Sequence, residues 1–325
     1  MGVSEQDLSD VRAALDRLGI RNAVESERTS IRRLGGLTNR VYLIGSSYRS
    51  FVLRIPGAGT EEYINRKVEA VAARAAARAG VSPEVLATTD DGLMLTAAIP
   101  KAVTLSPEGF ASIPGAPGRA ADVLRKLHAS GETFDFRFEL FTMIDDYLKV
   151  LSGKTVDLPD GYHDVLASAE AVRAALNAHP LPLAPCHCDP LSENFIDADG
   201  RMWLVDWEYS GMNDPLWDLG DVIVEAKLAP DKEAEFVQAY FGGTPSSAEQ
   251  AIDDRDGARS PAEQGRVVIY KAMCDLLWTL WGLIQHANNN PADDFWAYAT
   301  GRFERCKALM ATPAFPAHVA AVAKG

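Results

Sequence analysis

The order of apolar and polar positions divides the chain into a β-rich first third and a long helical remainder. Residues 1–20 alternate charged and apolar positions at helical spacing, which predicts an opening helix. Two short strand-like runs, Arg40–Ile44 and Ser50–Ile55, predict a hairpin across the polar stretch between them. The run Glu61–Ala79 is rich in strong helix formers and is followed by a glycine and a proline, so it predicts a helix.

Two further strand-like runs complete a small predicted sheet. They are Val85–Ala87 and Leu93–Ala97, separated by a segment rich in turn residues. Residues 100–118 hold several prolines and glycines and are expected to link two parts of the chain. At 325 residues the chain exceeds the size at which one hydrophobic core usually keeps growing, so we predict two lobes, residues 1–99 and 100–325.

Beyond residue 120, helical periodicity dominates. One β-like island, Ala184–Asp206, interrupts it and carries most of the polar residues of chemical interest. Two long helices, Arg266–Asn288 and Asp293–Met310, are expected after a charged loop at residues 245–263. The pattern as a whole predicts an α+β fold, with a small sheet lobe that carries one helix and a larger, mainly α-helical lobe.

Composition and charge narrow the class of protein. Hydrophobic residues make up 47% and charged residues 24%, as in ordinary globular enzymes. The formal net charge of -13 argues against a nucleic-acid partner, because phosphate backbones are held by clustered lysines and arginines. The opening residues do not resemble a signal peptide, and no uninterrupted apolar stretch predicts a membrane span. The four cysteines read as reduced thiols, so we expect a cytoplasmic protein.

The β-like island carries a spaced set of groups suited to phosphoryl transfer. The segment from His187 reads H-x-D-x-x-x-x-N, and a D-x-E pattern begins at Asp206. Phosphoryl transfer needs a carboxylate to orient the attacking hydroxyl and oxygen ligands to hold Mg²⁺ against the phosphates. We therefore interpret Asp189 as the base, with Asn194 and Asp206 as metal ligands, and His187 as a residue that braces the loop. The alternative is a set of ordinary turn residues.

At these motifs the chain resembles the choline/ethanolamine kinases within the aminoglycoside phosphotransferase superfamily, relatives of the protein kinases. The stretches Asp206-Trp207-Glu208-Tyr209 and Trp217-Asp218-Leu219 resemble the choline/ethanolamine branch more than the antibiotic kinases. The resemblance runs from about Arg32 to the last helix. It implies a protein-kinase-like two-lobed fold, ATP and Mg²⁺ as cofactors, and an alcohol acceptor.

The resemblance also assigns residues of the first lobe to the nucleotide. Gly35, Gly36, Leu37, Thr38 and Asn39 match the loop that covers the phosphates, where glycines let the backbone approach phosphate oxygens. Arg54 matches the position of the phosphate-binding lysine of kinases, and Glu69 is its expected ion-pair partner. Read alone, the loop is a hairpin turn and Glu69 an exposed helix charge.

The acceptor is expected to be choline. A quaternary ammonium donates no hydrogen bond, so its recognition requires aromatic faces and nearby negative charge. Trp278 and Trp281 share a helix face, and Tyr298 follows on the next helix, a pattern that resembles the choline-binding region of choline kinases. Asp218 and Glu225 lie two helical turns apart and are expected to add negative potential. Paired aromatics at this spacing are otherwise more often plain core.

Other readings remain open from the sequence. Ethanolamine, thiamine or an aminoglycoside could be the acceptor, and a catalytically silent cation-binding module is a reading from another class. Cys188 and Pro190 stand where many relatives have Asn and Leu. The hinge at residues 98–101 lacks the Glu-Gly pair common in relatives, so the preferred nucleotide is less firmly expected than Mg²⁺. The oligomeric state is not predicted.

Overall fold

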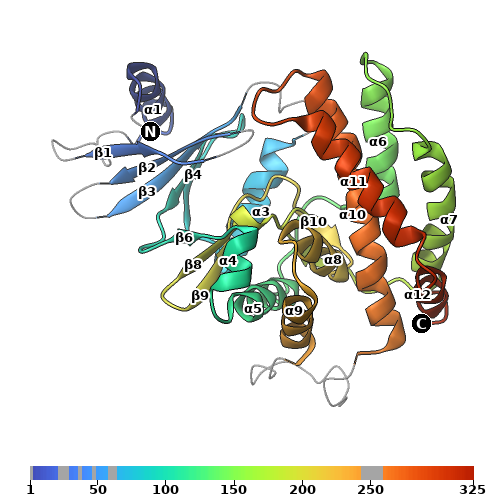
Figure 1. Ribbon diagram of the computed structural model, residues 1–325. Coiled ribbons are helices and arrows are strands. Elements are labelled where there is room, and N and C mark those ends of the chain that lie inside the picture. Colours follow the sequence, from blue (N-terminus) through green and yellow to red (C-terminus); the bar gives the residue numbers. More distant parts are fainter. Residues whose placement is uncertain (1–2, 21–28, 36–38, 46–48, 58–63, 243–258) are drawn as a thin grey trace.

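The computed structural model describes residues 3–20, 29–35, 39–45, 49–57, 64–242 and 259–325. It shows a twisted sheet at the N-terminal side and a helical body at the C-terminal side, with one helix between them (Figure 1). The predicted α+β, kinase-like architecture is confirmed. Residues 245–258 of the predicted charged loop lie outside the described residues.

The N-terminal sheet has five antiparallel strands in the order β1-β2-β3-β5-β4. The strands are β1 (Ser30–Arg33), β2 (Arg40–Gly45), β3 (Ser50–Ile55), β4 (Val85–Thr88) and β5 (Met94–Ala97). The predicted hairpin is the β2–β3 pair, in which Val41 lies opposite Arg54. Strand β1 has the burial pattern of an exposed edge and was not predicted, because the charged run SIRR carries no apolar alternation.

Two helices of the N-terminal part pack against different cores. Helix α1 (Glu5–Arg17) buries Val11 and Leu15 against the sheet and shares a small core with it. Helix α3 (Arg66–Arg78) instead turns its alanine face toward the large core of the C-terminal body. Small side chains allow this close approach, so the Ala-rich composition that predicted the helix also fixes its place between the lobes (Figure 1).

Residues 100–118 are more ordered than the predicted linker. They form β6 (Val103–Thr104) and α4 (Pro107–Ser112), and α5 (Ala116–His128) begins within them. Strand β6 pairs with β8 of the C-terminal body. Ser106 caps α4 and a proline stands in its first turn, so the Pro and Gly residues mark helix starts here rather than an irregular connection.

The β-like island is confirmed as two small antiparallel sheets within the helical body. One pairs β7 (Ala184–Cys186) with β10 (Gly211–Asn213), and the other pairs β8 (Phe195–Ala198) with β9 (Arg201–Leu204) and β6. The remaining helices are α6 (Leu140–Ser152), α7 (Tyr162–Ala178), α8 (Leu216–Glu225), α9 (Pro230–Gly242), α10 (Pro261–Ala287), α11 (Phe295–Met310) and α12 (Phe315–Val322).

Helix α10 is the centre of the C-terminal body. It packs against α6, α8, α11 and α12 and is buried along most of its 27 residues (Figure 1). Among the described helices it alone is long and apolar enough to cross a membrane, but 83% of its apolar window is buried inside the protein. It is the core helix of this body, and it positions the aromatic residues discussed below.

Candidate active site

The loop that follows β7 is held from below by one buried carboxylate. Asp218, fully buried near the start of α8, accepts hydrogen bonds from the backbone N–H groups of His187 and Cys188, both at 2.8 Å. Its Oδ2 also lies 3.0 Å from Nε2 of His128, and His128 Nδ1 lies 2.7 Å from the Tyr240 hydroxyl. Asp218 therefore uses its oxygens to hold the loop and α5.

His187 braces this loop and is held neutral. Its Nε2 lies 2.9 Å from the carbonyl oxygen of Val205, which can only accept, so Nε2 carries the proton. Burial lowers the pKa of His187, against the opposing charge of Asp218. These contacts agree with the bracing role expected from the sequence.

Asp189 emerges from this loop, half-buried, into an acidic neighbourhood. Its pKa is raised well above the usual range, first by loss of water and then by the charges of Asp221, Glu225 and Asp206, against which Arg302 acts. A carboxyl group tuned in this way binds a proton more readily than a free aspartate. That property suits a group that receives or orients a hydroxyl proton.

The two expected metal ligands flank Asp189. Asn194 donates from its amide nitrogen to the Asp189 carbonyl oxygen at 3.0 Å, which leaves the side-chain oxygen as the ligand atom. Asp206 has a positive φ of 69°, a strained conformation that proteins retain mainly at functional sites. Loss of water and the charge of Glu208 raise its pKa to about 8 against the opposing charge of Arg54, although its side chain is 40% exposed and water screens part of this effect.

The donor set fits a magnesium ion. Carboxylate oxygens of Glu69, Asp206 and Glu208 lie within 4.8 Å of one another, and the set offers only the hard oxygen ligands that Mg²⁺ prefers. Two of these carboxylates are already neutralised by arginines, whereas Asp206 reaches solvent. Asp206 is therefore the carboxylate that remains available to a cation, together with the side-chain oxygen of Asn194.

The expected pair on the first lobe is formed. Arg54 of β3 donates to Glu69 of α3, and both side chains are buried. Nη1 of Arg54 also lies 3.5 Å from Asp206 and 3.4 Å from Glu208, so the pair faces these two carboxylates of the other lobe. Asn39 donates to Glu208 from the end of the predicted phosphate loop. Gly35 lies after β1, and Gly36, Leu37 and Thr38 lie outside the described residues.

Four aromatic residues gather between α10, α11 and the turn after β9. Tyr209 meets Trp278 edge to face with ring centres 5.2 Å apart, and Trp281 meets Tyr298 in the same way at 5.6 Å. Among the described residues, the indole nitrogens of both tryptophans are buried without a hydrogen-bond partner. Tyr209 stood in the motif DWEY but was not assigned a role from sequence.

Acidic residues line the same region. Glu225 receives a hydrogen bond from Arg302 of α11, whose other nitrogen lies 3.1 Å from Asp275 of α10. Asp221 is fully buried one turn before Glu225. Within the described part of the chain its oxygens have no hydrogen bond of good geometry, although the Trp278 side chain acts to lower its pKa. Burial, then Glu225, raise the pKa of Asp221 well above the usual range. Arg302 compensates Glu225 and Asp221, and it shares Asp275 with Arg305.

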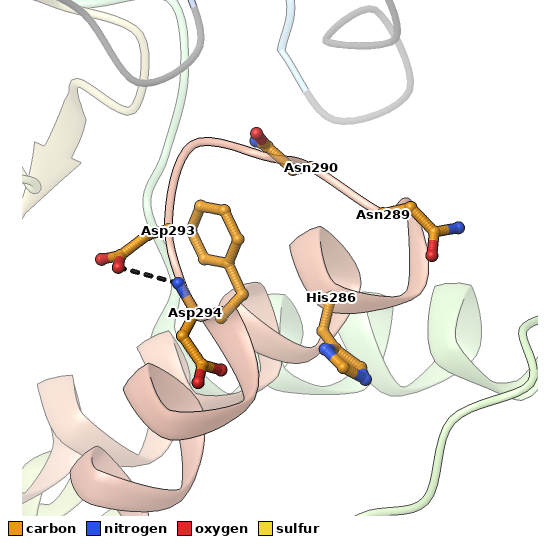
Figure 2. A pocket seen from close by; sticks show the side chains of 6 residues that line it. His286, Asn289, Asn290, Asp293 and Asp294 are labelled. Atoms are coloured by element: carbon orange, nitrogen blue, oxygen red, sulfur yellow. Dashed lines mark hydrogen bonds between the residues drawn. The ribbon is translucent and has the colours of Figure 1, made fainter.

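A shallow pocket at the α10–α11 connection is separate from this cluster. His286, Asn289, Asn290, Asp293, Asp294 and Phe295 line it (Figure 2). Its acidic groups serve the chain locally: Asp293 accepts from the Asp294 backbone, and Asp294 caps α11. The buried Phe295 ring contacts Trp281 at 5.6 Å, so this connection supports one wall of the aromatic group.

Sequence reasoning missed several residues that the fold brings to the site. Asp221 sits at a helix position indistinguishable from a surface charge in sequence. Arg302 stands four residues after Tyr298 and Arg66 three residues before Glu69, and neither was assigned a role. Glu208 stood in the D-x-E pattern without a role. Only the spacing of Asp221 one turn before Glu225 could have drawn attention to it.

A two-lobed body with an Arg–Glu pair on one side and an Asp, Asn and Asp set on the other is the arrangement of an ATP-dependent phosphotransferase. Residues 31–307 match the model of the choline/ethanolamine kinase family. The chain belongs to that family, and its enzyme class follows from this membership.

Solved structures and a sequence relative of the same kind are similar to this chain. A choline/ethanolamine kinase family protein of Mesorhizobium loti is 59% identical, with a TM-score of 0.84 over 98% of this chain and 99% of that one. The choline kinase LicA of Streptococcus pneumoniae is 25% identical, with a TM-score of 0.75 over 93% of this chain and 99% of that one. A structure of LicA in complex with AMP is also 25% identical, with a TM-score of 0.73. Protein LicA of Haemophilus influenzae is 29% identical over 85% of this chain and 78% of its own length.

Proposed function

We propose that this kinase transfers the γ-phosphate of ATP to the hydroxyl of choline, giving phosphocholine and ADP. The family covers choline and ethanolamine, so the enzyme class is established and the acceptor is the open question. The observation that carries the choice of choline is that aromatic faces and buried carboxyl groups lie together beside Asp189. The protein is expected to act in the cytoplasm on a small dissolved substrate.

The nucleotide end of the reaction is supported by the first lobe. The loop at residues 35–39 and Arg54 would hold the phosphates, with Glu69 orienting the guanidinium. Asn194 and Asp206 would hold Mg²⁺, which when bound neutralises charge on the phosphates. The structure of LicA in complex with AMP supports nucleotide binding.

Asp189 is the group proposed to act on the acceptor. Its raised pKa lets it accept a hydrogen bond from the hydroxyl and take up the proton as the oxygen attacks phosphorus. The backbone bonds to Asp218 fix the start of its loop, so the carboxylate is positioned before the substrate arrives. The proton leaves Asp189 to solvent after transfer.

Choline is favoured over ethanolamine by the character of the pocket. A primary ammonium donates three hydrogen bonds and is best served by carbonyl or carboxylate acceptors at close range. A trimethylammonium group is bound by aromatic faces and by charge at longer range. Trp278, Trp281, Tyr209 and Tyr298 supply the faces. Glu225 supplies charge, and a bound cation would favour the ionised form of Asp221. Ethanolamine remains the second candidate because the family includes it.

The test is an ADP-release assay with Mg·ATP and a panel of choline, ethanolamine, thiamine and an aminoglycoside. Asp189→Asn is the blank, and its turnover should fall about 10²-fold or more while its affinity for Mg·ADP stays within twofold. Choline-selective turnover supports the proposal. Selective turnover of ethanolamine would reject choline. If none of the acceptors is turned over, the reading as a catalytically silent module is favoured.

A matched tryptophan pair tests the pocket itself. Trp281→Ala should raise the KM for choline about tenfold with the KM for ATP unchanged, since a cation–π contact contributes about 1–2 kcal/mol when shielded from water. Trp296→Ala is the control, because Trp296 is on the neighbouring helix but 39% exposed. Equal effects of the two substitutions would remove Trp281 from the acceptor site.

A further inference from the structure

The contact between the lobes at the nucleotide cleft depends on a second arginine. Arg66, the first residue of α3, is 7% exposed and lies beside the Arg54–Glu69 pair. Its Nη1 is 2.9 Å from Glu69 and 2.6 Å from Glu208, so one nitrogen contacts carboxylates of both lobes. We propose that Arg66 is a positioning residue that holds Glu208, and with it the Asp206 strand end, in register with the first lobe.

In the part of the chain that the structure describes, Oε1 of Glu208 is contacted by side chains of the first lobe. This oxygen accepts from Asn39 and from Arg66, and Nη1 of Arg54 lies 3.4 Å away. The side chain is only 6% exposed, so these charge-assisted bonds lie in a poorly hydrated place where they are strong and directional. Since Glu208 stands two residues after Asp206, fixing it fixes the approach of the proposed metal ligand to Arg54.

Arg66 occupies its place against the local preference of the helix. A cation in the first turn meets the positive end of the helix dipole, where acidic residues are favoured. The fold nevertheless makes room for it: Gly92 has a φ of 96°, and a Cβ there would lie 2.6 Å from Cδ of Arg66. The carbonyl oxygen of Gly92 also receives Arg54 at 3.3 Å. One turn thus accommodates both arginines.

The same helix offers a matched comparison. Arg78, at the other end of α3, also pairs with a carboxylate of the second lobe, Glu132, but its side chain is 61% exposed. An exposed pair of this kind contributes little. If any ion pair between α3 and the second lobe sufficed, the two arginines would be equivalent; if register at the cleft matters, only Arg66 should affect the nucleotide.

The test measures Mg·ADP and choline affinities by calorimetry, so it rests on the kinase assignment but not on turnover. Arg66→Met and Glu208→Gln should each weaken the affinity for Mg·ADP about tenfold. The double variant should bind Mg·ADP no more weakly than the single variant with the lower affinity. Arg78→Met should stay within twofold. Choline affinity should be unchanged in all four, because its proposed pocket lies wholly in the second lobe.

Two results would overturn the proposal. One is a double variant whose loss equals the product of the two single losses, which would mean that Arg66 does not act through Glu208. The other is an equal loss of choline and nucleotide affinity in Arg66→Met, which would indicate a general folding defect. Arg66→Lys keeps the buried charge in case the methionine variant does not fold; a loss of about threefold is expected for Mg·ADP, and none would also reject the proposal. An acceptor other than choline leaves the nucleotide measurements intact.

Discussion

Asp221 is the residue whose environment is least explained by folding alone. A buried carboxylate without a hydrogen bond costs free energy, and here Glu225 adds repulsion. Proteins retain such groups at binding sites, where a bound ligand supplies the compensating charge or hydrogen bond. A cationic acceptor would do so, which makes Asp221 a residue where stability and binding should oppose each other.

We predict that Asp221→Asn stabilises the free enzyme at pH 8 and weakens choline binding. Because the folded-state pKa of Asp221 is raised above its unfolded value, its contribution is most favourable below the unfolded pKa and is lost as the pH rises through the folded pKa. The melting temperature should therefore rise by roughly 2–6 °C at pH 8, with the difference closing toward pH 4. The groups that face Asp221 are Asp189, Asp218, Glu225, Cys274 and Arg302.

The same variant should raise the KM for choline about tenfold with little change in that for ATP. Asp122→Asn is the control, since Asp122 lies inside α5 with a side chain 58% exposed. A fall in melting temperature at pH 8, or an unchanged KM for choline, would show that Asp221 is a structural residue rather than part of the acceptor pocket.

At the scale of elements, the sequence predicted those that periodicity or composition marks clearly. The hairpin of β2 and β3, the Ala-rich helix and the β-like island all form. Strand β1 was missed because its charged residues pair on an exposed edge, where burial imposes no alternation. The linker was misjudged because Pro and Gly residues start helices as readily as they interrupt them.

The residues of the candidate site also differ in how well the sequence marks them. Asp189, Asn194 and Asp206 could be predicted because one short segment carries them at a fixed spacing. The helical spacing of Asp218 and Glu225 predicted that Asp218 adds negative charge near the cation. Its hydrogen-bond partners lie on α5 and on the loop after β7, which are brought together only by the fold. Partners that meet through packing of distant helices leave no local signal, and Arg302 with Glu225 is another such pair.

Two glycines on adjacent helices separate packing from helix propensity. A Cβ on Gly282 of α10 would lie 2.7 Å from the Tyr298 ring, whereas nothing lies within 4 Å of one on Gly301 of α11. Gly301→Ala should stabilise the protein by about 0.5–1 kcal/mol with unchanged kinetics. Gly282→Ala should move the Tyr298 ring, destabilise by about 1–3 kcal/mol and raise the KM for choline.

Thermal unfolding and steady-state kinetics on both variants check this prediction. Gly282→Ala with an unchanged KM for choline would mean that Tyr298 can shift without disturbing the acceptor, and so does not line its pocket. A destabilised Gly301→Ala would instead contradict the open surroundings of that position.

At the scale of the whole molecule, the two substrates of the proposed reaction carry charges of opposite sign in the same electrostatic field of the protein. The protein carries a formal net charge of -13, and carboxylates cluster at the proposed acceptor pocket. Choline is a cation that this field attracts, whereas Mg·ATP is an anion that it repels at long range. Local arginines such as Arg54 must therefore capture the nucleotide at short range, where salt screens less.

Salt should consequently act differently on the two substrates. Raising KCl from about 20 mM to 300 mM shortens the Debye length severalfold, so kcat/KM for choline should fall by roughly three- to tenfold while that for Mg·ATP falls less or rises. Steady-state kinetics with the other substrate saturating measure each value. Parallel losses for both substrates would indicate general salt inhibition, and the acidic field would then have no part in selecting a cationic acceptor.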